Sequence, residues 1–173
     1  IGVRLVGSEM CIRDRYSLKD GGTSYSGTVT QDVTPVADVP TLGVTDAALG
    51  NEDTAIALDI TGALVDVDGS ETLTYTITGV PTDSTFNKGS LSTNTWTGAV
   101  SDVAGLTITP PTNDDGDFTL SVTATATETA NSETATSGLE TIAVTVTAVA
   151  DAPTLTVNPD ISANEDEDSG PLN

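Results

Sequence analysis

The sequence predicts an all-β protein: a Greek-key β-sandwich of about seven short strands that forms one module of a tandem array. Three observations lead to this prediction. The chain repeats part of itself, several segments alternate apolar and polar residues with a period of two, and no stretch shows sustained helical periodicity. Threonine, which occurs 32 times, and valine both favour pleated, half-buried strands.

The repeat defines the size of the module. Residues 33–53 read VTPVADVPTLGVTDAALGNED and residues 146–166 read VTAVADAPTLTVNPDISANED, with 12 of 21 positions identical and no gap. The period is 146 − 33 = 113 residues, about the length of one β-sandwich domain. We therefore expect a complete repeat at 39–150, preceded at 20–38 by the last strand of another repeat plus a linker. Residues 151–173 would be the next linker and a truncated repeat.

Four rows of apolar residues at every second position predict strands that are buried on one face. In chain order these rows are Ile56, Leu58 and Ile60; Leu73, Tyr75 and Ile77; Phe118, Leu120, Val122, Ala124 and Ala126; and Ile142, Val144 and Val146. Weaker strands are expected near Gly89–Trp96 and Leu106–Thr109. Residues 25–34 would be the last strand of the preceding repeat. Turn signals such as Asp68-Gly69 and Pro110-Pro111 separate the strands.

Residues 1–19 are interpreted as non-native and are left out of the fold prediction. Within them, residues 6–15 (VGSEMCIRDR) contain the only Cys and the only Met, and they look like translated sequencing adapter. The alternative is a genuine irregular loop of the preceding domain. Because Cys11 is the single cysteine, no disulfide within the chain and no thiolate zinc site are expected.

The charge balance excludes several classes of partner. The chain has 26 acidic and 5 basic residues, a formal net charge of −21, and Lys88 is the only basic residue after Lys19. Nucleic acid and anionic membrane surfaces are excluded because both need clustered Lys and Arg. No apolar run approaches the ~20 residues needed for membrane insertion. With no His and one Cys, we expect no catalytic residues and no enzyme.

The acidic residues gather at expected turns, in Asn51–Asp53, Asp66–Glu71 and Asn113–Asp117. Carboxylates at i and i+2 of an extended segment project from the same face and repel each other. Calcium relieves such repulsion because it takes six to eight oxygen ligands. A heavily solvated acidic surface is the alternative. The candidate metal ligands are Asp38, Glu52, Asp53, Asp66, Asp68, Asp115, Asp117, Glu128 and Asp151.

Trp96, the only tryptophan, admits two interpretations. On the surface it could stack on a sugar ring and mark a carbohydrate site. In a small sandwich a lone tryptophan more often belongs to the core, and we favour that prediction.

Residues 35–166 resemble the bacterial cadherin-like, immunoglobulin-like repeats of large type I-secreted adhesins of the repeats-in-toxin type. The motifs that carry the resemblance are NEDT from Asn51, DVDGSETLTYTI from Asp66, NDDGDFTLSVTATATE from Asn113 and VADAPTL from Val149. It implies calcium between modules, with two sets of ligands. Asp38, Asp66, Asp68 and Glu128 would face the N-terminal junction, and Glu52, Asp115, Asp117 and Asp151 the C-terminal one. The linker here has one acid where the family has three, which implies fewer or weaker ions.

The resemblance implies a non-catalytic, calcium-binding extender module of a bacterial cell-surface or secreted adhesin. Its cofactor would be Ca²⁺ and its partners the neighbouring repeats of the same chain. Two alternatives remain open at the level of sequence. One is a glycan-binding or homophilic adhesion module, and the other is an accessory domain of a secreted polysaccharide-degrading enzyme.

Overall fold

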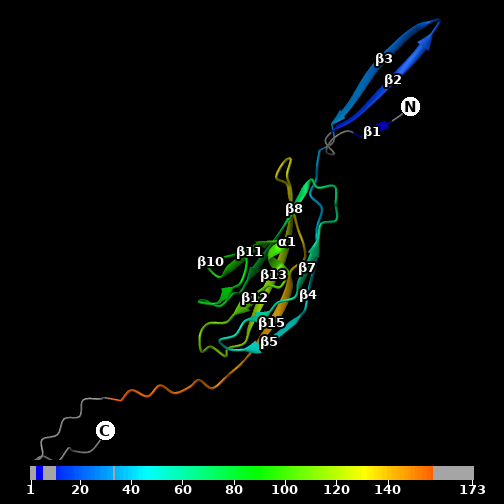
Figure 1. Ribbon diagram of the computed structural model, residues 1–173. Helices are drawn as coiled ribbons and strands as arrows, with labels where there is room; N and C mark the ends of the chain where they lie inside the picture. Colours follow the sequence, from blue (N-terminus) through cyan, green and yellow to red (C-terminus); the bar gives the residue numbers. More distant parts are fainter. Residues whose placement is uncertain (1–2, 6–10, 33, 158–173) are drawn as a thin grey trace, which may run out of the picture.

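A computed structural model describes residues 3–5, 11–32 and 34–157, and its regular structure is almost entirely β. In these residues there are fifteen strands and a single helix, the four-residue α1 (Val100–Val103). The all-β prediction is therefore confirmed. Figure 1 shows a body of packed strands, a long hairpin beyond one end and an extended tail leaving the other end.

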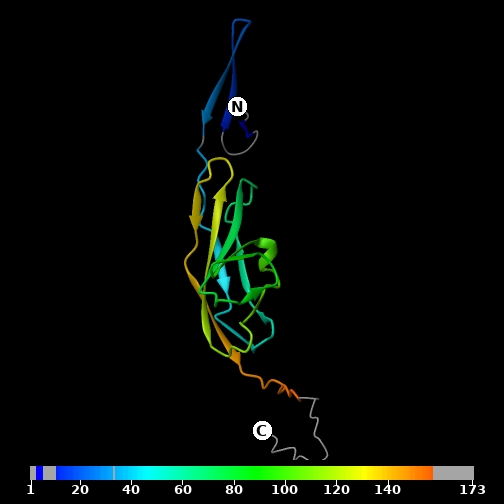
Figure 2. The same cartoon turned by 90° about the vertical axis from the view of Figure 1, so that its left-hand side faces the viewer.

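The hairpin belongs to a separate N-terminal sheet with the order β1-β2-β3. Its antiparallel strands are β1 (Val3–Leu5), β2 (Cys11–Asp20) and β3 (Thr23–Asp32). Figure 2 shows the hairpin pointing away from the body. β3 covers most of residues 25–34, which were expected as the last strand of a preceding repeat. That residues 1–19 are non-native stays a prediction, and residues 1–2 and 6–10 lie outside the described residues.

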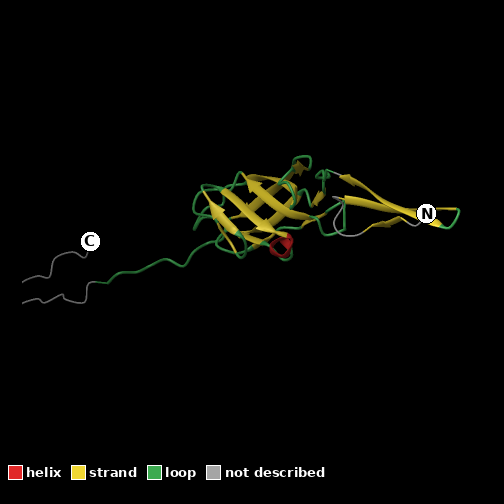
Figure 3. Cartoon of the chain, turned by 90° about the horizontal axis from the view of Figure 1, so that it is seen from above, coloured by secondary structure: helices red, strands yellow, loops and turns green. Residues whose placement is uncertain are grey.

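The body contains one large sheet with the order β10-β11-β8-β13-β15-β5, and β14 pairs with β13. Its strands are β5 (Ala47–Asn51), β8 (Glu71–Thr78), β10 (Ser90–Ser92), β11 (Thr95–Ala99), β13 (Phe118–Glu128), β14 (Thr134–Thr136) and β15 (Glu140–Thr147). Neighbouring strands are antiparallel, except that β5 runs parallel to β15. Figure 3 shows the body as strands joined by loops, with the single short helix in red at its edge.

Two smaller sheets complete the body. One has the order β6-β12-β9, with β6 (Ile56–Ala57), β12 (Thr107–Thr109) and β9 (Thr85–Phe86). The other pairs β4 (Thr41–Val44) with β7 (Ile60–Ala63). Several sheets around a shared interior are consistent with a β-sandwich.

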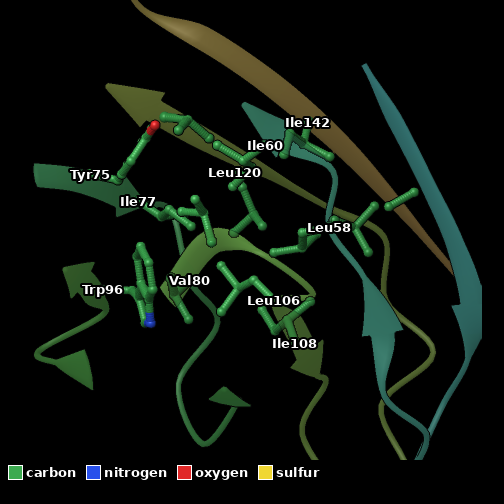
Figure 4. Close-up of a cluster of buried hydrophobic side chains, with 14 of the residues drawn as sticks. Leu58, Ile60, Tyr75, Ile77, Val80, Trp96, Leu106, Ile108, Leu120 and Ile142 are labelled. Atoms are coloured by element: carbon green, nitrogen blue, oxygen red, sulfur yellow. The ribbon is translucent and has the colours of Figure 1, made fainter. Parts of the chain in front are cut away.

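One hydrophobic cluster joins the large sheet to the smaller ones, as Figure 4 shows. In β8, Leu73, Tyr75 and Ile77 are buried while the threonines between them lie on the opposite face. The other predicted rows are buried as well, except that Phe118 is only half-buried. The row that begins at Ile56 does not form one strand, however, because it is divided between β6 and β7, which belong to different sheets. Burial of these rows supplies the main stabilisation of the fold, since it removes apolar surface from water.

Trp96 belongs to this core, as predicted, and is 0% exposed. Its ring lies against Phe86, with 5.7 Å between the ring centroids, and its Nε1–H donates to the carbonyl of Lys88 at 2.7 Å. Gly89 has φ +74° and approaches the indole so closely that a Cβ there would lie 2.5 Å from it. The indole is thus enclosed by side chains and backbone.

Candidate metal sites at the two ends of the sandwich

Strand β13 connects two groups of acidic residues at opposite ends of the body. Asp117 directly precedes β13 and Glu128 is its last residue, so they lie roughly 35 Å apart along the strand. We call the end at Glu128, where linker 34–40 arrives, the proximal end. The end at Asp117, where linker 148–153 leaves, is the distal end.

At the proximal end, two glutamates face each other in the interior. Glu71 begins β8 and Glu128 ends β13, and the antiparallel register makes them direct cross-strand partners. Glu71 is 7% exposed and Glu128 is 2% exposed. Glu128 Oε1 accepts a hydrogen bond from the Ala130 N–H at 3.3 Å. Two carboxylates are therefore held close together with little access to water.

The same end binds the incoming linker. Glu71 Oε1 accepts a hydrogen bond from the backbone N–H of Asp38 at 2.8 Å. The Asn131 side chain donates to the Pro35 carbonyl at 2.8 Å. The second oxygen of Glu71, Oε2, is buried without a hydrogen-bond partner. One oxygen of this carboxylate thus fixes the linker, and the other has its lone pairs available for a cation.

Asp66 and Asp68 lie in the loop that leads into β8. Asp66 Oδ1 accepts from the Asp68 N–H at 3.0 Å, and Asp68 Oδ1 accepts from the Ser70 N–H at 2.7 Å. Gly69, with φ +92°, supplies the left-handed backbone that the turn requires. Consecutive side-chain-to-backbone bonds of this kind order the loop and keep both carboxylates at the proximal end.

At the distal end, Glu52 binds the departing linker. Glu52 is 8% exposed, and its Oε1 accepts from the backbone N–H of Val149 at 2.6 Å. Its own N–H donates to the Thr147 carbonyl at 3.0 Å, which continues the pairing of β5 with β15. Glu52 and Glu71 thus play the same structural part at opposite ends of the body.

The remaining distal acids are more exposed. Asp117 Oδ1 accepts from the Val146 N–H at 2.9 Å. Asp53, with φ +57°, accepts from the Asn113 N–H at 3.0 Å and so ties two loops together. Asp115 and Asp151 are exposed on the loop and the linker.

Eight of the nine candidate ligands lie at the end of the body that the resemblance implies for them, and Asp53, which had no assigned end, lies at the distal end. Nevertheless, within the described residues no three or more Asp, Glu or Cys side chains converge closely enough to hold a metal ion. Calcium binding therefore stays a prediction. Lys88, the one basic residue after Lys19, donates its Nζ to the Ala104 carbonyl, beside the core tryptophan.

A shallow depression of about 620 Å³ lies beside the proximal end. Its lining is largely apolar and includes Leu64, Val67, Leu73 and Val100, with Glu71 and Asp66 also contributing. Val67 is 89% exposed. The proximal end thus combines carboxylates with uncovered apolar surface.

Sequence reasoning missed Glu71 as a site residue. A signal was present, because Glu71 is two positions before Leu73 and so continues the inward-facing row of β8. Glu128 continues the row of Ala124 and Ala126 in β13 in the same way.

Comparisons with family models, curated proteins and solved structures gave no match. The cadherin-like resemblance therefore rests on the motifs of residues 35–166 alone. In the part of the chain that the structure describes, no helix is long and apolar enough to cross a membrane.

Proposed function

We propose that residues 39–150 form a non-catalytic, calcium-binding extender module, a cadherin-like Greek-key repeat in a bacterial surface or secreted adhesin. One observation carries the proposal: three buried glutamates lie at the two ends of the body, and two of them bind the linkers. Glu71 accepts from Asp38, Glu52 accepts from Val149, and Glu128 faces Glu71. The buried carboxylates of the module thus lie at the two ends where neighbouring modules would join.

Buried carboxylates favour a bound cation. An ionised group withdrawn from water is stable only when it is paired or coordinated. The sequence offers a single basic residue between Asp20 and Asn173, and that residue, Lys88, bonds to Ala104. A hard divalent cation such as Ca²⁺ suits oxygen-only ligands, including carboxylates and backbone carbonyls.

Each end of one module supplies half of a site. In a tandem array the distal acids of one repeat, Glu52 and Asp117, would meet the proximal acids of the next, Glu71 and Glu128. Together these four carboxylates bring eight oxygens to one joint, which matches the six to eight oxygen ligands of calcium. An ion that binds only the ordered joint stabilises that joint and stiffens the array.

A chain with two full repeats tests the proposal. In this two-repeat chain, residues 41–173 follow Pro153, which keeps the period at 154 − 41 = 113 residues. We expect calcium to raise its melting temperature and to lengthen it in small-angle X-ray scattering, relative to chelator. At about 100 times the dissociation constant, one ion adds about 2.7 kcal/mol of stability. An unchanged melting temperature together with an unchanged length would overturn the proposal.

The main argument for the glycan-binding alternative was an exposed Trp96, and the structure removes it. That side chain is 0% exposed and packs against Phe86. The accessory-domain alternative has no specific observation in its favour.

A further inference from the structure

Two backbone amides of the linkers are bound by glutamates at opposite ends of the same module. The Asp38 N–H donates to Glu71 at 2.8 Å, and the Val149 N–H donates to Glu52 at 2.6 Å. By the 113-residue period, Val149 corresponds to Val36 and Asp151 corresponds to Asp38. In the shared linker sequence Val-Ala-Asp, the first amide is therefore held by the module before it and the third by the module after it.

We propose that consecutive modules grip one linker from both sides, with Glu52 of the preceding copy on Val149 and Glu71 of the following copy on Asp151. The proximal end is then a docking site for the linker that leaves the distal end of a second copy. The inference rests on the proposed function because it assumes a tandem array, but the grip itself needs no metal ion.

The exposed residues after the linker identify a second copy as the partner. Leu155 and Val157 are 87% and 71% exposed. Their counterparts one period earlier, Leu42 and Val44, lie in β4 and pack against the core. Residues 154–157 correspond to β4 one period later. If they form β4 of the next module, the apolar side chains of Leu155 and Val157 become buried against its core.

The grip fixes the geometry of the joint. In an extended segment the N–H groups of residues i and i+2 point to the same edge, about 7 Å apart. Glu52 and the next copy's Glu71 therefore lie side by side along one edge of the linker. The Asn131–Pro35 bond at 2.8 Å adds a third attachment. Because few linker residues lie between these hydrogen bonds, the linker cannot bend as a hinge between the two modules.

Amide hydrogen exchange of the full chain and of the two-repeat chain, both in chelator, tests the grip. In the full chain, we expect the Asp38 and Val149 amides to exchange at least about tenfold more slowly than those of Asp151 and Val36. In the two-repeat chain, the Asp151 amide should become protected to the level of Asp38.

Variants of the second copy identify the partner of that amide. Glu71→Ala in the second copy alone should expose Asp151 again, whereas Glu71→Gln, which keeps an acceptor oxygen, should preserve protection. Glu140→Ala in the second copy is the matched control, because Glu140 is exposed. The first copy stays intact, and the amides of β8 and β13 in the second copy report whether that copy is folded in every variant.

The two proposals fail in different ways. An unprotected Asp151 amide in a two-repeat chain whose second copy is folded overturns the grip, whatever calcium does. A protected Asp151 amide together with no calcium effect on melting supports the grip and overturns only the calcium proposal.

Discussion

Glu71 and Glu128 are direct partners across β8 and β13, and both side chains are buried. Like charges directly opposite each other in a sheet are destabilising, by about 0.2–1 kcal/mol. In an interior of low dielectric the repulsion is stronger than in water. The pair therefore destabilises the proximal end, and a cation bound between the two carboxylates would remove the repulsion.

Neutralising one member of the pair should separate repulsion from calcium binding. We expect Glu128→Gln in chelator to raise the free energy of unfolding by about 0.2–1 kcal/mol, because Gln keeps an acceptor for the Ala130 N–H and removes a like charge. Calcium should then stabilise the variant less than the wild type. Chemical denaturation with and without calcium measures both effects, with Glu140→Gln as the exposed control. A variant less stable than the wild type in chelator would contradict the repulsion.

The loop before β8 allows structural and metal-binding roles to be distinguished. Asp66→Asn keeps an oxygen that can accept from the Asp68 N–H. We therefore expect its stability in chelator to stay within about 0.5 kcal/mol of the wild type, while the stabilisation by calcium falls. Asp66→Ala should in addition lose about 0.5–1.5 kcal/mol in chelator, because the turn loses its acceptor.

The readout is the melting temperature of the two-repeat chain in calcium and in chelator. Asp83→Asn is the matched control, since Asp83 is exposed and its φ of +70° is one that Asn tolerates. An undiminished calcium effect in Asp66→Asn would remove Asp66 from the proposed ligands.

The core strands could be predicted because alternation alone specifies them. Leu73, Tyr75 and Ile77 have a period of two that no helix would present. β4 and β5 were not predicted, although both lie inside the repeated segment. In β5 only Ala48 is buried, so the strand exists through its backbone pairing with β15 and leaves little trace in side-chain pattern.

The site was predictable in part for the same reason. Acidic loop residues such as Asp66 can be recognised in the sequence because they cluster next to glycine. Glu52 and Glu128 were also named as candidate ligands, whereas Glu71 was missed. That all three are buried follows only from their positions at the ends of inward-facing rows. Which glutamate binds which linker amide depends on contacts 33 and 97 residues apart in sequence, which no local pattern encodes.

The burial of Trp96 makes a spectroscopic prediction. We expect blue-shifted tryptophan fluorescence that resists quenching by iodide and does not respond to oligosaccharides. Trp96→Phe should cost about 1–3 kcal/mol, because it leaves a void and removes the donor to the Lys88 carbonyl. Urea denaturation measures the loss. Saccharide-dependent emission of the native chain would revive the glycan-binding alternative.

Tyr75 is expected to lower the stability of the fold at alkaline pH. Its side chain is 0% exposed, its hydroxyl has no hydrogen-bond partner, and burial raises its pKa above the usual value of 10.0. The unfolded chain releases this proton near pH 10, whereas the folded chain retains it to higher pH. The stability that the protonated hydroxyl of Tyr75 contributes is therefore fully present below pH 10. The free energy of unfolding falls as the pH rises from 10 to the pKa of Tyr75 in the folded chain.

Tyr75→Phe tests this directly, since it removes a hydroxyl that makes no hydrogen bond. We expect the variant to match the wild type within about 1 kcal/mol at pH 8. Between about pH 10 and pH 11 it should lose less stability than the wild type, because Phe has no proton to release. Urea denaturation across this range measures the difference, and each protein at pH 8 is its own reference. Parallel losses in the two proteins would show that Tyr75 does not set the limit, and would assign the alkaline instability to the remaining titrating groups.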